Sequence, residues 1–245
     1  MGLKAVCVFK RFPGQRFDVV DFKCEKVRIA YARGDIETLL ELIRKGTPEV
    51  RREALYALAQ SGFSDAGMVL KEIAKNRWNE HPETRIVALQ SLESLSEKDA
   101  YADFVEDFIT GESRIVEKAA RKILSRIDPA GFPNRLARRG CTDHGAMNVY
   151  GRSRSTTAIP LIRDFLMDCA SRGEFTAGGI WGRVYAGLRA LEKIGTTEAF
   201  ETISLFTDAA MSHGQPDEKS IAFQRYLKVL DAARFAMEKR RADGF

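Results

Sequence analysis

The chain has 245 residues, of which 44% are hydrophobic and 30% are charged. This composition excludes an intrinsically disordered chain, and no apolar run approaches the roughly 20 residues that a membrane-spanning helix needs. The formal net charge of +5 falls well short of the dense basic composition of a dedicated nucleic-acid-binding protein.

Neither the N-terminus nor the cysteines point to secretion. The apolar run of residues 5–9 is too short for the core of a signal peptide. Four cysteines and three histidines lack the spacing of a disulfide framework or a metal site. We therefore expect a cytoplasmic protein with reduced thiols, no metal site and no cofactor.

Two interpretations are open for the first 33 residues. Residues 3–22 contain two β-branched and aromatic runs around Phe12-Pro13-Gly14-Gln15, as in a small hairpin. Alternatively, Asp18 caps a helix that runs to Arg33 and ends at Gly34. We favour the helix over residues 18–33 and expect residues 1–17 to form an irregular N-terminal cap.

The next hundred residues repeat one helical pattern three times. The three segments are Pro48–Leu58, Pro82–Leu92 and Ser113–Leu124. Aligning Ala54 with Ala88 and Ala120 gives spacings of 34 and 32 residues, which suit a unit of two helices. Within each segment, apolar residues recur at helical spacing.

Partner helices are predicted between these segments. The predicted ranges are Ile36–Lys45, Asp65–Asn76 and Ala100–Thr110. Asp35 and Thr47 are typical N-cap residues, and Gly46 and Gly62 are typical helix ends. The short breaks between helices favour antiparallel neighbours.

The second half of the chain is less regular. Helical periodicity returns in Ile159–Arg172, Ile180–Ile194, Glu198–Met211 and Glu218–Arg240. Residues 128–157 show no clear repeat unit and are rich in glycine and arginine. We interpret them as an insertion that is either functional or disordered, with a short helix at Asn134–Arg139.

The repeated pattern resembles HEAT repeats, in particular the short bacterial units of the phycobilisome-lyase type. The resemblance depends on a Pro-Glu-x-Arg-x-x-Ala-Leu core, present at residues 48–55 and 82–89. It implies an all-α solenoid of antiparallel helical hairpins. We expect a single array over residues 1–245, with regular repeats over 18–127, the insertion over 128–157 and degenerate repeats over 158–240.

The family includes adaptors, lyases that act on bilin chromophores and DNA-binding relatives, and nothing in the chain selects the lyase chemistry. In such repeats, the repeated arginine ties neighbouring units together through an acidic residue. Arg51, Arg85 and Arg183 occupy this position, whereas Glu117 replaces it in the third unit. We expect the ladder to be broken there.

The strongest candidate for a binding surface is a cluster of five arginines that fall within a stretch of 20 residues inside the predicted insertion. They are Arg135, Arg138, Arg139, Arg152 and Arg154. Arginine forks bind phosphates and carboxylates, and Tyr150 is placed to stack on a base or a peptide ring. The alternative, which we favour slightly, is a solvated surface loop.

Other candidates have plainer interpretations. Arg51, Arg52 and Arg85 are candidates for a basic stripe on the inner helices, but an inter-repeat salt-bridge ladder is the simpler interpretation. Cys141 and His144 match no catalytic or metal motif. Trp78 and Trp181 are expected to serve in packing.

We therefore predict a non-catalytic scaffold that binds a protein partner on its inner helices, with the arginine cluster as an accessory contact. The alternative is a nucleic-acid-binding protein that contacts phosphates through the same arginines. Neither hypothesis involves a membrane.

Overall fold

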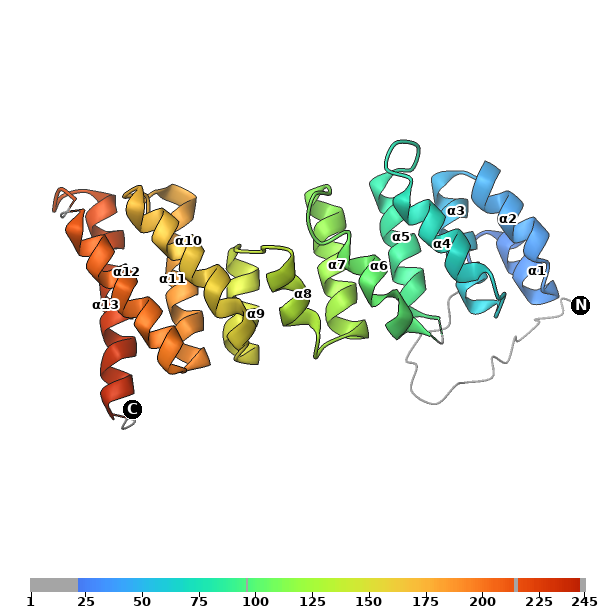
Figure 1. The fold of residues 1–245 in the computed structure, drawn as a ribbon. Coiled ribbons are helices and arrows are strands. Elements are labelled where there is room, and N and C mark those ends of the chain that lie inside the picture. The colour runs from blue at the N-terminus through green and yellow to red at the C-terminus, as the bar shows by residue number, and fades with distance from the viewer. Residues whose placement is uncertain (1–21, 96, 214–215, 243–245) are drawn as a thin grey trace, which may run out of the picture. The chain divides into compact units, whose positions relative to one another are not determined.

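The computed structural model describes residues 22–95, 97–213 and 216–242, and every regular element among them is a helix (Figure 1). The all-α class is therefore confirmed. The chain forms two compact units, Met1–Asp128 and Pro129–Phe245. One continuous array over residues 1–245 stays a prediction.

The described residues of the N-terminal unit form three helical hairpins preceded by one further helix. Its elements are α1 (Glu25–Arg33), α2 (Ile36–Lys45), α3 (Pro48–Gln60), α4 (Ala66–Lys75), α5 (Pro82–Glu93), the 3-10 helix η1 (Lys98–Tyr101), α6 (Ala102–Glu106) and α7 (Arg114–Ile127). The hairpins are α2/α3, α4/α5 and α6/α7, and α5 packs between α3 and α7. This stacking of hairpins is the arrangement of an α-solenoid.

Small residues allow the second helices of these hairpins to approach one another. Ala54, Ala88 and Ala120, which align the three repeats, are all fully buried. Leu55 and Leu89 beside them are also fully buried, and burial of each such side chain stabilises the fold by about 1.5–3 kcal/mol. A single hairpin has no second wall to cover this apolar face, so each repeat depends on its neighbour.

Local signals in the sequence set most of the helix ends. The side chain of Asp35 accepts a hydrogen bond from the Thr38 amide, and that of Thr47 accepts one from Val50, so both predicted N-caps are confirmed. The helix predicted over residues 18–33 is found from Glu25 to Arg33, and residues 22–24 are not helical, so the prediction of one continuous helix is wrong there. The predicted cap at Asp18 lies outside the described residues. The predicted cap over residues 1–17 lies outside the described residues, as does nearly all of the alternative hairpin.

In the C-terminal unit, the part of the chain that the structure describes also forms three hairpins. Its elements are α8 (Phe132–Arg138), α9 (His144–Ser153), the 3-10 helix η2 (Thr156–Ala158), α10 (Ile159–Ser171), α11 (Gly178–Ile194), α12 (Thr197–Ser212) and α13 (Ile221–Ala242). The hairpins are α8/α9, α10/α11 and α12/α13, and α11 packs between α9 and α13. Residues 128–157 are therefore not a loop, because they form the first hairpin of this unit.

Close packing explains why α9 carries glycines. A Cβ atom added at Gly151 would lie 3.0 Å from the Cα atom of Ala190 on α11, so the two backbones approach closely at this point. At the start of α9, the Asp143 side chain caps the helix by accepting hydrogen bonds from the amides of Gly145 and Ala146. None of the described helices is both long and apolar enough to cross a bilayer.

Candidate functional site

Arg51 and Arg85 serve as structural ties between repeats of the N-terminal unit. Arg51 pairs with Glu80, and the guanidinium of Arg85 makes two hydrogen bonds of 2.9 Å to the carboxylate of Glu112. The Nε atom of Arg85 also donates to the Ala74 carbonyl at 2.7 Å, and the residue is only 3% exposed. These arginines therefore form the expected ladder and not a stripe available to a partner.

The ladder affects the titration of its acidic members. Hydrogen bonds from Arg85 are the largest of the influences that hold the pKa of Glu112 below its ordinary value. A pKa that is lower in the folded state stabilises the fold above the unfolded pKa. This contribution is lost as the pH falls through the folded-state pKa.

The exposed side of α3, α5 and α7 carries a second row of paired side chains. Three hydrogen bonds make up this row: Arg52 donates to Glu83 at 2.6 Å, Tyr56 to Gln90 at 2.8 Å, and Arg126 to Glu93 at 3.1 Å. These hydrogen bonds join neighbouring repeats, and the polar groups that form them are already occupied within the chain. A hollow of about 700 Å³ beside Tyr56 is lined by Arg52 and by two carboxylates, Glu49 and Glu53.

The third repeat departs from the ladder, as its sequence predicts. The carboxylate of Glu117 accepts a hydrogen bond from the Glu112 amide at 3.3 Å. Arg121, one turn later, donates to the Ile109 carbonyl at 3.3 Å. In the C-terminal unit, Arg183 donates to both the carbonyl and the hydroxyl of Thr142, at 3.0 and 2.7 Å.

Several residues singled out in the sequence lie away from any surface site. Tyr150 is fully buried and its hydroxyl donates to the Cys141 carbonyl at 2.8 Å, so its ring is not available for stacking on a partner. Cys141 is also buried, and a ring nitrogen of His144 lies 3.3 Å from the Gly182 carbonyl. Trp78 is 89% exposed, which corrects the expectation that it packs in the core.

The five arginines of residues 135–154 separate into two groups. Arg135, Arg138 and Arg139 lie on or directly after α8, before α9 begins, and each already interacts with another part of the chain. Arg152 and Arg154 lie at the opposite end of α9, which is ten residues long. At 1.5 Å per residue, about 15 Å of helix separates the two groups.

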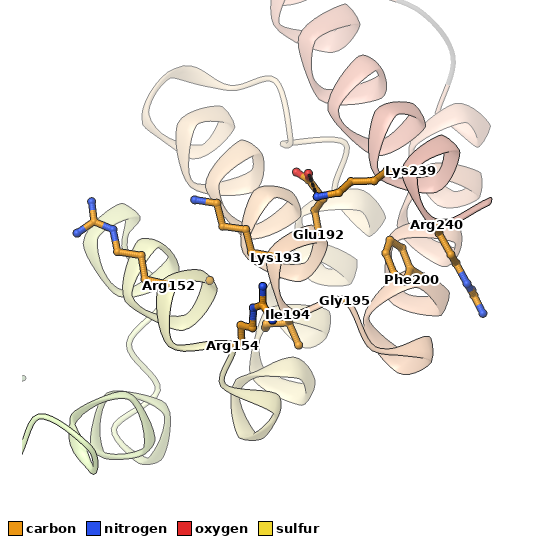
Figure 2. Close-up of a pocket in the computed structure, with 10 residues that line it drawn as sticks. Arg152, Arg154, Glu192, Lys193, Ile194, Gly195, Phe200, Lys239 and Arg240 are labelled. Atoms are coloured by element: carbon orange, nitrogen blue, oxygen red, sulfur yellow. Dashed lines mark hydrogen bonds and ion pairs between the residues drawn. The ribbon is translucent and has the colours of Figure 1, made fainter. Parts of the chain in front are cut away.

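Arg152 and Arg154 line a pocket within the C-terminal unit (Figure 2). We call it the basic pocket, because most of its charged residues are basic. It has a volume of about 500 Å³ and is formed by the ends of α9 and α11, the start of α12 and the end of α13. Its lining residues are Gly151, Arg152, Arg154, Glu192, Lys193, Ile194, Gly195, Phe200, Lys239 and Arg240. Five of these residues are basic, and one is acidic.

The acidic residue is already neutralised. The Glu192 side chain is only 4% exposed, and it pairs with Arg189 and with Lys239, whose Nζ atom lies 3.5 Å from its carboxylate. Figure 2 shows Lys239 directed toward Glu192. Arg240 lies over the ring of Phe200, with its guanidinium carbon 5.3 Å from the ring centre.

Among the described residues, Arg240 has no acidic partner but lies over Phe200, and three cations of the pocket have neither an acidic nor an aromatic partner: Arg152, Arg154 and Lys193. Arg152 and Lys193 are exposed on the ends of adjacent helices, α9 and α11. In Figure 2, Arg154 extends from the turn after α9 toward the part of α11 that carries Lys193. This arrangement gathers positive charge from separate elements and attracts an anion.

The sequence indicated only part of this pocket. Arg152 and Arg154 were in the predicted cluster, but Lys193, Lys239 and Arg240 were not. Basic residues near a helix C-terminus are ordinarily explained by the negative end of the helix dipole, which accounts for the Lys239-Arg240 run by itself. Only the packing of α9, α11 and α13 brings these residues to one place.

Comparison with known proteins identifies the repeats. The family model of HEAT repeats matches residues 36–125. These residues are HEAT repeats. HEAT repeats commonly mediate protein–protein interaction, and HEAT proteins are typically non-enzymatic scaffolds. No curated protein and no solved structure matches the chain.

The HEAT match covers the hairpins of the N-terminal unit from α2 almost to the end of α7. The closer resemblance to phycobilisome-lyase-type units stays a prediction. Within the described ranges, no group of three or more histidine, cysteine, aspartate or glutamate side chains is placed to hold a metal ion.

Proposed function

We propose that the protein is a non-catalytic scaffold that holds an acidic segment of a protein partner in the basic pocket. The observation that carries the proposal is the set of three cations without acidic partners at the ends of α9 and α11. By contrast, the arginines of the N-terminal unit that the sequence had nominated are paired within the chain. The pocket is therefore the better candidate for binding an anionic ligand.

The position of the pocket suits a scaffold of stacked hairpins. It lies where the second helices of three successive hairpins end, and the repeats that hold it are joined by the packing of α11 against α9 and α13. Rigid elements position binding side chains more accurately than loops do. A polypeptide segment carrying carboxylates satisfies the cations without any chemical step.

The alternative of nucleic-acid binding has one supporting observation, which is the presence of the same unpaired cations. However, a nucleic-acid strand carries charges at regular intervals and is bound by a row of cations that follows its backbone. In the C-terminal unit, Arg152 and Arg154 are about 15 Å of helix away from Arg138 and Arg139. The structure thus favours an acidic polypeptide.

A direct binding measurement tests the proposal. We expect a labelled, aspartate- and glutamate-rich peptide to bind the full chain in fluorescence anisotropy, and a neutral peptide of equal length not to bind. The double variant Arg152→Gln/Lys193→Gln should weaken binding by about five- to thirtyfold, since each charged contact contributes roughly 0.5–1 kcal/mol.

The matched control removes two positive charges elsewhere in the same unit. Arg234 and Lys219 are exposed and do not line the pocket, so Arg234→Gln/Lys219→Gln should leave the affinity within about twofold of wild type. Equal losses in both double variants would mean that net charge alone governs binding. That result, or no binding of the acidic peptide at all, would reject the pocket as the site.

A further inference from the structure

We infer that the preferred ligand of the basic pocket is a phosphorylated side chain within an acidic polypeptide segment. The inference rests on the proposed function and makes its ligand specific. It follows from the number and type of the cations that line the pocket, taken with the state of the one carboxylate in the pocket wall.

The number of free cations exceeds what one carboxylate needs. Arg152, Arg154 and Lys193 all lack acidic partners among the described residues, and Lys239 adds a fourth charge that is shared with Glu192. A carboxylate brings one negative charge, whereas a phosphate monoester brings about −1.5 to −2 at neutral pH and three acceptor oxygens. The phosphate is therefore the better electrostatic match.

The chemical type of the cations also favours a phosphate. Two of the three free cations are guanidinium groups, which present planar forks of N–H donors that fit phosphate oxygens in pairs. The third, Lys193, supplies a compact ammonium that approaches a remaining oxygen. They come from the C-terminal ends of α9 and α11 and from the turn after α9, so separate elements contribute them to the pocket (Figure 2).

Glu192 adds selectivity against weak anions. Its carboxylate lies buried in the wall, and Arg189 and Lys239 neutralise it. If a ligand carboxylate drew Lys239 away, Glu192 would lose part of the positive charge that balances it. The interaction of the ligand's single negative charge with the cations would offset this loss poorly. A dianion compensates more strongly through the free cations and leaves the Lys239–Glu192 pair in place.

The dimensions of the pocket favour a single phosphate over a chain of phosphates. A volume of about 500 Å³ accommodates one phosphorylated side chain with its neighbouring residues. The cations line one pocket, whereas nucleic acid requires positive charge distributed along a path.

Three peptides that differ at one central position test the inference: serine, glutamate or phosphoserine in the same acidic sequence. With the full chain near neutral pH, we expect the phosphoserine peptide to bind roughly tenfold more tightly than the glutamate peptide, and the serine peptide most weakly. In Arg152→Gln/Lys193→Gln, the advantage of phosphoserine over glutamate should fall below about threefold. In the control Arg234→Gln/Lys219→Gln, it should be retained.

The outcomes separate the inference from the proposed function. Equal affinities for the phosphoserine and glutamate peptides would overturn the inference and leave the proposed function intact. Failure of all three peptides, together with binding of short single-stranded DNA or RNA, would overturn both. Inorganic phosphate and pyrophosphate serve as competitors, and displacement at concentrations close to the affinity of the phosphopeptide would show that the site takes a small free anion, contrary to the inference.

The pH dependence provides an independent readout. The second pKa of a phosphate monoester is about 6, so its charge falls as the pH drops from about 7.5 to 5.5. The charged groups that line the pocket are Arg152, Arg154, Glu192, Lys193, Lys239 and Arg240, and none of the lining residues is a histidine. We expect the phosphoserine peptide to lose affinity severalfold over this range and the glutamate peptide, whose pKa is about 4.3, to lose little. Parallel curves for the two peptides would contradict the inference.

Discussion

Arg154 adopts a backbone conformation that the chain otherwise reserves for glycine. Its φ is 51°, and among the described residues it is the one non-glycine residue with positive φ. The other residues with positive φ are Gly34, Gly62, Gly111, Gly140, Gly173 and Gly195. A side chain in this region costs on the order of 1 kcal/mol, so arginine at the end of α9 lowers the stability of the fold.

Replacement of this arginine should therefore change stability and binding in opposite directions. We expect Arg154→Gly to raise the free energy of unfolding by about 1 kcal/mol and the melting temperature by about 2–4 °C, because glycine relieves the backbone strain. The same variant should bind the acidic peptide severalfold more weakly. Thermal denaturation and anisotropy on one preparation measure both effects.

Gly34 provides a control for the reverse substitution, from glycine to a residue with a side chain. Its φ is 66°, and a Cβ atom added there meets nothing within 4 Å, so Gly34→Ala isolates the cost of the conformation. This variant should lose about 1 kcal/mol and keep its peptide affinity. A destabilised Arg154→Gly variant would show instead that the guanidinium makes a contribution to folding larger than the strain.

The helices α9 and α11 approach each other closely beside the pocket. Leucine at position 151 would bring a Cβ atom to within 3.0 Å of the Ala190 Cα atom, and backbone on both sides limits any adjustment. We expect Gly151→Leu to cost about 1–3 kcal/mol and to weaken peptide binding, because it forces α9 and its Arg152 away from α11. Urea denaturation measures the first effect and anisotropy the second.

Gly182 on α11 is a suitable comparison, because a Cβ atom added there has nothing within 4 Å. Since glycine is a poor helix former, Gly182→Leu should be neutral or stabilise the fold by up to about 1 kcal/mol. If the two leucine variants were equally stable, the close approach of α9 and α11 would not hold in solution.

This crossing also explains what the sequence could and could not predict at the level of elements. Helices with proline, a capping side chain and regular apolar spacing, such as α3 and α5, were predicted with ends within a few residues. The helix α9 was predicted as a loop, because Gly145 and Gly151 are normally loop signals. Gly151 is present for close packing against a helix almost 40 positions later, and no local pattern encodes that contact.

Only part of the candidate site was predicted, because its other residues join it through contacts between distant parts of the chain. Arg152 and Arg154 stand out because they are dense in sequence, whereas Lys193 and Lys239 are separated from them by 39 residues or more and join them only through packing. Conversely, Tyr150 and Arg85 carry suitable chemistry, but the fold buries both. Sequence shows which side chains are able to bind an anion, and tertiary packing decides which of them remain available.

For the whole molecule, net charge is a poor guide to binding. The formal charge is +5, yet many arginines of the N-terminal unit are bonded to carboxylates of the neighbouring repeat. Long-range attraction to a polyanion depends on unpaired cations that follow its backbone, and the pocket concentrates three of them in one place. We therefore expect anions to bind at the pocket and not along the paired arginines of the N-terminal unit.

This distribution predicts a shallow salt dependence toward nucleic acid. Three phosphate contacts on a single strand give a slope of about −2 in a plot of log K against log salt concentration. We expect weak binding of short single-stranded DNA with a slope no steeper than this value, and Arg138→Ala/Arg139→Ala should leave it unchanged. A slope of about −5 or steeper would require more cations than the pocket holds. If Arg138→Ala/Arg139→Ala then made that slope shallower, both ends of α9 would contact the strand and nucleic acid would replace the acidic polypeptide as the ligand.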